Sequence, residues 1–208
     1  MEIRRFVSDL LQSNTYVIEE NGRAIAVDPG RDVLPARGLA VDRILLTHEH
    51  YDHISGVNAW KDAFGAPVLC TQACAAAIGD PKRNLARIFD VFCELQTWIR
   101  LKEKPDADRT FACSAEETFE DVFRFAWQGH SFRLFALPGH SPGGAGILLD
   151  GSHFFSGDSL LPGESVELRL PGGSKRAWEE ISLPRLKALP DGITIYPGHF
   201  APFTYQKA

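Results

Sequence analysis

The chain has 208 residues, of which 44% are apolar and 24% charged, and its formal net charge is −5. This length suits one domain, which we expect to span residues 1–208, and the composition excludes a disordered or membrane protein. The acidic balance argues against general nucleic-acid binding, which needs a basic face. We expect a cytoplasmic protein, because the first residues lack the apolar core of a signal peptide and no later run could cross a bilayer.

Short apolar segments open the chain at residues 3–7, 16–18 and 24–27. Asn21-Gly22 separates the last two and is a strong hairpin signal, so we predict an antiparallel start to a sheet. Asp28 follows directly, in Val27-Asp28-Pro29-Gly30. Two interpretations of Asp28 stay open: ordinary turn chemistry, or a carboxylate that orients a metal-bound imidazole.

A buried strand predicted at residues 43–46 leads into a dense group of metal-binding residue types. Within Thr47-His48-Glu49-His50-Tyr51-Asp52-His53, four side chains can hold a metal: His48, His50, Asp52 and His53. Imidazole and carboxylate together suit zinc and neighbouring first-row metals. In an extended loop residues two apart point the same way, so His48 and His50 could bind one ion. Asp52 and His53, where a helix begins, could turn toward a second.

Alternating segments then predict a layered α/β arrangement: a helix at 54–64, a strand at 68–70, a helix at 71–78 capped by Thr71, and a helix at 84–92. Residues 93–116 show no sustained period. This segment is either an inserted lid or binding loop, or a helix that the pattern does not reveal. The four cysteines, Cys70, Cys74, Cys93 and Cys113, are expected to be reduced, buried thiols rather than a second metal site.

The rest of the chain predicts strands at 122–127 and 132–137, a hairpin of 145–149 with 153–156, a helix at 175–189 and a strand at 193–196. His130 lies in a turn, where we expect it to be solvated. Three ends of strands offer further ligands, namely His140, Asp158 and His199. Together with the first four they make seven candidate ligands, enough for two ions that share one carboxylate.

The spacing His48-x-His50-x-Asp52-His53, with His140, Asp158 and His199, resembles the metallo-β-lactamase-fold hydrolases. Four further motifs are similar to the glyoxalase II-like (hydroxyacylglutathione hydrolase-like) branch: Leu137-Pro-Gly-His-Ser-Pro-Gly-Gly, Ser156-Gly-Asp-Ser-Leu-Leu, Leu170-Pro-Gly-Gly-Ser and Tyr196-Pro-Gly-His199. The resemblance covers nearly the whole chain, least so residues 93–120.

This resemblance implies a four-layer αββα sandwich and two divalent metal ions, with zinc as the first choice and iron or manganese as alternatives. By position, one ion would take His48, His50 and His140, the second would take Asp52, His53 and His199, and Asp158 would bridge them. A metal-bridging hydroxide would attack a small ester, thioester or lactone, and Asp52 would also handle a proton.

The substrate is less well indicated than the fold. Relatives commonly carry a glutathione-holding C-terminal extension, for which this chain leaves no room, and a Gly-Arg-x-Asp segment where Val166-Glu167-Leu168-Arg169 stands here. Arg169 and Tyr51 are open as substrate contacts, against a surface ion pair and loop packing. The alternatives are an iron-dependent redox enzyme such as a sulfur dioxygenase, a phosphodiesterase, or a noncatalytic module. The expected partner is a small molecule, not nucleic acid or membrane, and the oligomeric state is not indicated.

Overall fold

The computed structural model describes residues 1–95 and 105–207. Within them, strands form two six-stranded sheets. The first has the order β1 (Glu2–Val7), β2 (Asn14–Glu20), β3 (Arg23–Val27), β4 (Ala40–Leu45), β5 (Val68–Thr71) and β6 (Glu117–Phe119). The second has the order β12 (Phe203–Thr204), β11 (Thr194–Pro197), β10 (His153–Gly157), β9 (Ala145–Leu149), β8 (His130–Ala136) and β7 (Val122–Trp127).

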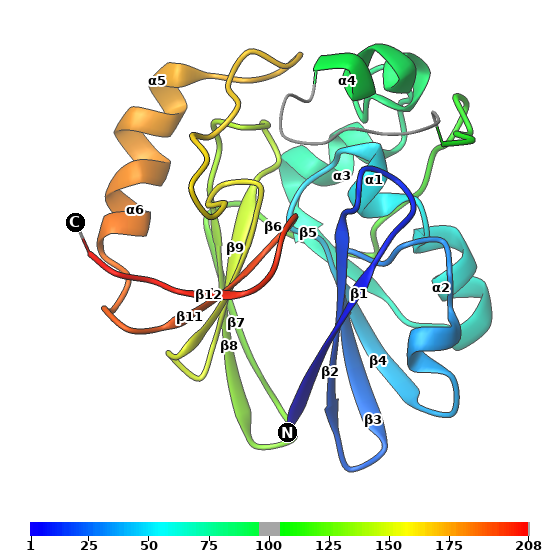
Figure 1. Cartoon of the computed structure of the whole chain (residues 1–208). Coiled ribbons are helices and arrows are strands. Elements are labelled where there is room, and N and C mark those ends of the chain that lie inside the picture. Colours follow the sequence, from blue (N-terminus) through cyan, green and yellow to red (C-terminus); the bar gives the residue numbers. More distant parts are fainter. Residues whose placement is uncertain (96–104, 208) are drawn as a thin grey trace.

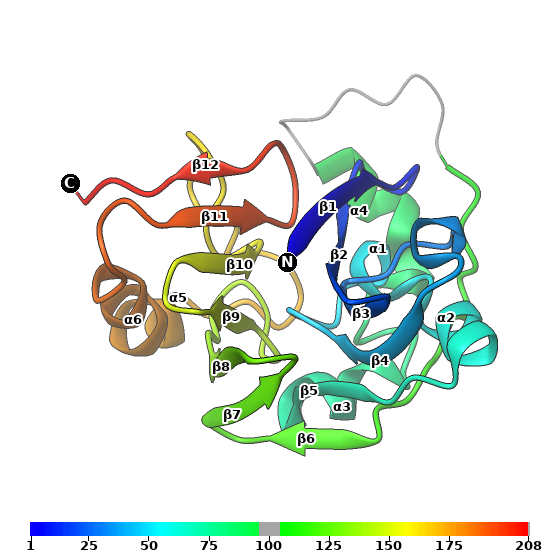
Figure 2. The same cartoon turned by 90° about the horizontal axis from the view of Figure 1, so that it is seen from below.

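Helices cover the outer face of each sheet (Figures 1 and 2). The first sheet is covered by α1 (Tyr51–Ile54), α2 (Val57–Phe64), α3 (Gln72–Ile78) and α4 (Phe89–Leu95), with short 3-10 turns η1 (Leu34–Ala36) and η2 (Ala86–Ile88). The second is covered by α5 (Lys175–Ala177), the π-helical segment η3 (Trp178–Ser182) and α6 (Leu183–Lys187). This is the predicted αββα sandwich. Among the described residues, none of the helices combines the length and the apolar character of a transmembrane span.

Strand periodicity explains why the layers stack in this way. On β3, Ile25 and Val27 pack into the core between the sheets, whereas Ala24 and Ala26 pack into the core under the helices. Successive side chains of a strand point to opposite faces, so a strand that is apolar at every position can serve both cores at once. A third apolar cluster joins the second sheet to α6.

The predicted hairpins are confirmed. Asn21 and Gly22 have φ of 53° and 75°, and Asp150 and Gly151 have φ of 50° and 69°. Positive φ at both central residues defines the type I′ turn that matches the twist of paired strands. These turns set the antiparallel pairs β2 with β3 and β9 with β10.

Some boundaries differ from the prediction. The predicted helix at 54–64 is two helices, and the first begins at Tyr51, so Asp52 and His53 lie in its first turn. The helix predicted at 175–189 ends at Lys187 and contains the π-helical segment η3. This segment ends two residues before Pro184, which has no N–H to continue the α-helical ladder. Strand β6 was not predicted, because three residues are too few to show a period.

The segment at 93–116 lies only partly among the described residues. Helix α4 continues to Leu95, so the start of the segment is helical. Residues 105–116 run against α1 and α2: the Asp108 N–H donates to the Tyr51 hydroxyl at 3.0 Å, and the Asn58 amide donates to the Ala112 carbonyl at 3.0 Å. Residues 96–104 lie outside the description, and the lid function remains a prediction.

Candidate metal centre

All seven predicted ligands lie together where strands of both sheets end. They follow β4 (His48 and His50), occupy α1 (Asp52 and His53), or follow β8 (His140), β10 (Asp158) and β11 (His199). Helix α1 lies at the upper end of the first sheet in Figure 1. Every one of these side chains is at most 8% exposed. Seven buried polar side chains in one place need a common partner, because unpaired polar groups are costly to bury.

His48, His50 and His140 form the first group. One nitrogen from each ring lies within 4.8 Å of the others, and Nε2 of His140 is 3.1 Å from Nδ1 of His50. Two nitrogens that bind one tetrahedral ion, each about 2.0–2.1 Å from it, lie roughly 3.3 Å apart. The spacing of these donors therefore fits a single divalent ion.

Asp52, His53 and His199 form the second group, also within 4.8 Å of one another. Nε2 of His53 lies 3.3 Å from Nε2 of His199, and Oδ2 of Asp52 lies 3.4 Å and 3.5 Å from these two nitrogens. Donor atoms of Asp28, His48 and His53 also lie within 4.8 Å of one another, so the division of the ligands between two ions stays the one that the resemblance implies.

Asp158 lies between the groups. Its Oδ2 is 3.5 Å from Nε2 of His140 and 3.3 Å from Nε2 of His199, and its Oδ1 is 3.5 Å from Nε2 of His53. One carboxylate thus contacts a ring nitrogen of each group, which is the position of a bridging ligand.

Buried atoms without hydrogen bonds support a cation at this place. Among the described residues, both carboxylate oxygens of Asp52, Oδ1 of Asp158 and Nε2 of His48 are buried and lack a hydrogen-bond partner. Buried polar atoms are nearly always hydrogen-bonded unless they bind an ion or water. Nitrogen and carboxylate donors suit zinc, iron and manganese, so the residues present fit two divalent metal ions.

The histidines differ in protonation when no cation is bound. Burial lowers the pKa of His48, His50 and His140, since the charged imidazolium is poorly solvated there. Burial acts on His53 in the same direction, but the nearby carboxylates, Asp52 foremost, outweigh it and raise its pKa to about 10. The first group therefore presents neutral imidazoles, the form that binds metals.

The two carboxylates also differ. Burial raises the pKa of Asp52. Burial acts on Asp158 likewise, yet the imidazoles of His199 and His53 hold the pKa of Asp158 well below its ordinary range. Asp158 is consequently ionised at neutral pH, as a ligand shared by two cations must be.

A second layer of contacts orients the rings. Oδ1 of Asp28 accepts the Thr47 N–H at 2.7 Å, and Oδ2 accepts the Thr47 hydroxyl and lies 3.2 Å from Nδ1 of His53. The Thr47 oxygen is also 3.1 Å from Nδ1 of His48. Asp28 has φ of 48°, so both interpretations of this residue hold: it makes the turn and it orients an imidazole.

Two contacts that the sequence did not reveal complete the centre. Nδ1 of His140 lies 2.9 Å from the Glu167 carbonyl oxygen, which leaves Nε2 of His140 to face the first group. Beside Asp158, a Cβ at Gly198 would lie 2.2 Å from the Asp158 carboxylate, so only glycine permits this approach. No local pattern signals the Glu167 contact, because any residue has a carbonyl.

The other candidates lie outside the two groups. Tyr51 is buried and packs against Phe89 and Phe111, with its hydroxyl on Asp108 N–H. Arg169 is exposed and pairs with Glu167 at 2.6 Å. Tyr51 thus packs against its neighbours and Arg169 forms a surface ion pair, which are the alternatives to substrate contact given above.

His130 and the cysteines are also separate from the centre. His130 begins β8 and pairs at 2.6 Å with Asp150, which lies in the turn between β9 and β10. Within residues 1–95 and 105–207, no cysteine belongs to any cluster able to hold a metal. Cys70, Cys74 and Cys93 are buried thiols, as expected, whereas Cys113 is only half-buried.

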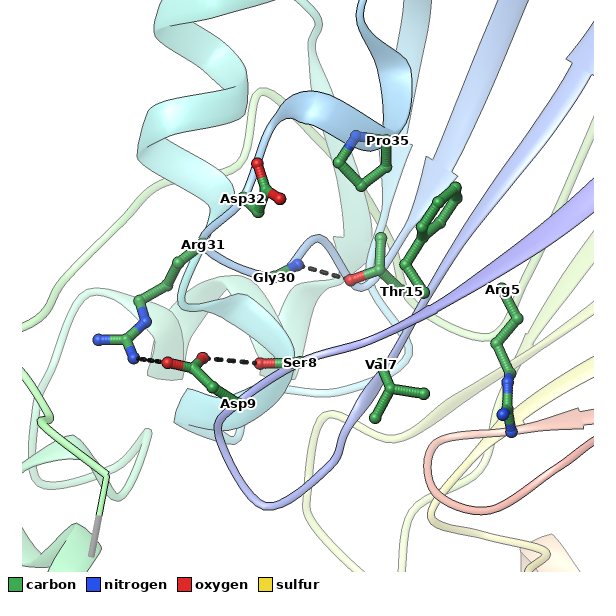
Figure 3. Close-up of a pocket in the computed structure, with 10 residues that line it drawn as sticks. Arg5, Val7, Ser8, Asp9, Thr15, Gly30, Arg31, Asp32 and Pro35 are labelled. Atoms are coloured by element: carbon green, nitrogen blue, oxygen red, sulfur yellow. Dashed lines mark hydrogen bonds and ion pairs between the residues drawn. The ribbon is translucent and has the colours of Figure 1, made fainter.

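A pocket of about 680 Å³ lies beside β1, with its lining drawn in Figure 3. None of the seven metal-centre residues lines it. Its Arg31 pairs with Asp9, and its Thr15 accepts the Gly30 N–H at 2.7 Å. Because these polar groups satisfy one another and no candidate ligand lines the pocket, this cavity is separate from the metal centre.

The fold and the site define a class, a His/Asp cluster at the edge of an αββα sandwich, and sequence comparison gives the family. The model of the metallo-beta-lactamase superfamily matches residues 8–199. The chain belongs to this superfamily. Family membership and the His/Asp clusters together place it among metal-dependent hydrolases.

Curated proteins related in sequence include hydrolases, at modest identity. The chain is 27% identical to a probable metallo-hydrolase of Streptococcus pyogenes serotype M6, over 96% of this chain and 84% of that protein. It is 29% identical to a hydroxyacylglutathione hydrolase of Alkalilimnicola ehrlichii, over 88% of this chain but only 59% of that protein.

Solved structures share the fold along almost the whole chain. BLEG-1, a B3 metallo-beta-lactamase, superposes with a TM-score of 0.78 at 25% identity, covering 98% of this chain and 94% of its own. TTHA1623 in a di-iron-bound form superposes with a TM-score of 0.69 at 28% identity, covering 97% and 94%.

Proposed function

We propose that this protein is a binuclear metal-dependent hydrolase of a small ester, thioester or lactone, with zinc as the first candidate metal. His48, His50 and His140 would hold one ion, Asp52, His53 and His199 would hold the other, and Asp158 would contact both. The single observation that carries the proposal is the contact of Asp158 with ring nitrogens of both groups, at 3.3–3.5 Å.

The chain's own residues arrange the reaction. Two divalent ions supply, when bound, a water of lowered pKa and a Lewis acid for the substrate carbonyl. The buried imidazoles keep bulk water away from the reacting group, and Asp28, Thr47 and the Glu167 carbonyl hold three of the rings in place. Asp52 takes up, at a carboxylate oxygen, the proton that the attacking water loses and returns it to the leaving group.

Two observations bear on the substrate class. The hydroxyacylglutathione hydrolase relative favours an acyl thioester or a similar carbonyl substrate. The chain spans only 59% of that relative, and Arg169 is exposed and engaged with Glu167, so glutathione recognition is not part of the proposal. We expect a small-molecule substrate.

An iron-dependent redox enzyme of the same fold is the second candidate. It is favoured by the di-iron form of TTHA1623, which is 28% identical. The full set of seven donors, with a histidine at position 50, argues against a mononuclear iron site, which we expect to use fewer protein ligands.

Metal analysis and turnover test the proposal together. Protein from its native host is expected to carry two ions per chain and to hydrolyse at least one member of a panel of esters, thioesters and lactones. His140→Ala should abolish turnover, whereas His130→Ala, a histidine paired outside the centre, should leave it intact. Two bound ions without turnover of any acyl substrate would contradict the hydrolase, and oxygen consumption by the iron form would support the second candidate.

A further inference from the structure

Glu49 lies between His48 and His50 in sequence but belongs to neither ligand group. In the extended segment before α1, alternate side chains point to opposite sides, so Glu49 is directed away from the imidazoles beside it. It is 1% exposed, and no cation lies within ion-pair distance of it among the described residues. A buried carboxylate without a cation needs hydrogen bonds to offset its lost hydration.

Those hydrogen bonds come from the loop that carries His140. Oε2 of Glu49 accepts the Ser141 hydroxyl at 2.9 Å and the Gly143 N–H at 3.1 Å, and Oε1 lies 3.3 Å from the same N–H. Ser141 is fully buried. The carboxylate therefore joins two loops that are about 90 residues apart in sequence and supply the whole first group.

Close packing at Gly143 accompanies this contact. A Cβ on Gly143 would lie 2.4 Å from Oε2 of Glu49 and 2.5 Å from the Cys74 Cα, so only glycine fits. On its other side, the Gly143 carbonyl accepts the Thr71 hydroxyl at 2.9 Å, and Thr71 caps α3. The His140 loop is thus held between Glu49 and the start of α3.

We propose that Glu49 is a positioning residue for the first metal ion. Its carboxylate ties the His48–His50 segment to the Ser141–Gly143 loop and so sets the 3.1 Å separation of the His50 and His140 nitrogens that lets both bind one cation. The inference rests on the metal binding proposed above. A carboxylate that only stabilised the fold would affect both ions equally or neither.

Titration of the metal-free full chain with Co²⁺, followed by visible absorption, tests this role. His140→Ala and His199→Ala serve as references that assign each binding step to its group. Glu49→Ala is expected to weaken the step assigned to His48, His50 and His140 by about 10- to 100-fold, the usual effect of losing a contact behind a ligand, and to leave the other step unchanged. Glu49→Gln keeps an acceptor for Gly143 N–H and should restore most of the affinity.

Glu116→Ala is the matched control. Glu116 also accepts a backbone N–H, from Val68 at 2.9 Å, but lies outside the candidate metal clusters. The Glu116→Ala substitution should lower the melting temperature and leave both Co²⁺-binding steps unchanged. If Glu49→Ala does the same, the proposal is wrong.

Ser141→Ala gives an independent result should Glu49→Ala not fold. This variant keeps the carboxylate and removes one of its donors, so it should weaken the same Co²⁺ step by a smaller factor. Unchanged affinity at that step would overturn the role of Glu49. Wild-type protein that bound no Co²⁺ would instead overturn the metal-binding proposal itself.

Discussion

Oδ2 of Asp28 lies 3.2 Å from Nδ1 of His53. Asp28 directly follows β3 and His53 belongs to α1, so the contact joins the end of the first sheet to the second ligand group. It leaves Nε2 of His53 facing Asp52 and His199. A carboxylate on the outer nitrogen of a ligand imidazole fixes its tautomer and raises its basicity.

Asp28→Asn should therefore weaken the ion of the second group. The amide cannot hold the His53 ring as the carboxylate does, and we expect a loss of about 10- to 100-fold in affinity, measured by isothermal titration with Zn²⁺. Asp150→Asn is the matched control, because Asp150 contacts Nδ1 of His130 in the same way outside the centre. Equal effects of the two substitutions would contradict the assigned role.

Asp158→Ala should lower both metal content and activity. Since the loss of a contact behind a ligand already costs 10- to 100-fold, removal of the shared carboxylate should reduce turnover by at least about 100-fold. Metal content by elemental analysis and the rate with the best acyl substrate provide the check. If the Asp158→Ala variant kept the metal content and the reaction rate of the wild type, Asp158 would not be a ligand.

Chelation should destabilise the protein. An ion that binds only the folded state stabilises it by about 2.7 kcal/mol when the free ion concentration is 100 times the dissociation constant. Without them, the seven buried donors keep their desolvation cost, so EDTA should lower the melting temperature and added Zn²⁺ should restore it. Identical melting curves with and without EDTA would mean that no ion is bound tightly.

Arg169 should make stability depend on pH through Glu167. Its hydrogen bond and charge lower the pKa of Glu167 from 4.5 to about 2. Because the folded pKa is depressed, this stabilisation is present above about pH 4.5 and is lost as the pH falls toward 2. Both partners are near the surface, so we expect about 1 kcal/mol or less.

The measurement compares the free energy of unfolding of wild type and Arg169→Ala between pH 7 and pH 2. The difference should shrink as the pH falls, and NMR titration should find the Glu167 carboxyl near its ordinary pKa in the variant. A difference that stays constant with pH would show that the ion pair contributes nothing.

Leu134→Ala should test the core between the sheets. Leu134 is fully buried in that core, and its truncation should cost about 2–5 kcal/mol in the free energy of unfolding. Leu34→Ala is the control, since Leu34 is 60% exposed and should change stability by no more than about 0.5 kcal/mol. Chemical denaturation of both variants compares them, and similar losses would argue against this core.

Local sequence signals were enough for most of the fold. The type I′ hairpins at Asn21-Gly22 and Asp150-Gly151 were predictable because positive φ favours these residues, and the Thr71 cap because its hydroxyl accepts the Cys74 N–H three residues on. Strand β6 was missed, since its pairing with β5 comes from tertiary structure and not from a pattern in three residues.

The candidate ligands of the metal centre were identified from the sequence itself, because histidine and aspartate are among the few side chains that bind such metals, and the motif places four of the seven within one short segment. Their division into groups came from family resemblance. Only the tertiary structure decided which atoms face each other, and it alone gave Glu49 a place against Ser141 and Gly143. Such contacts join residues far apart in the chain, and a hydrogen bond between distant loops leaves no periodic trace in the sequence.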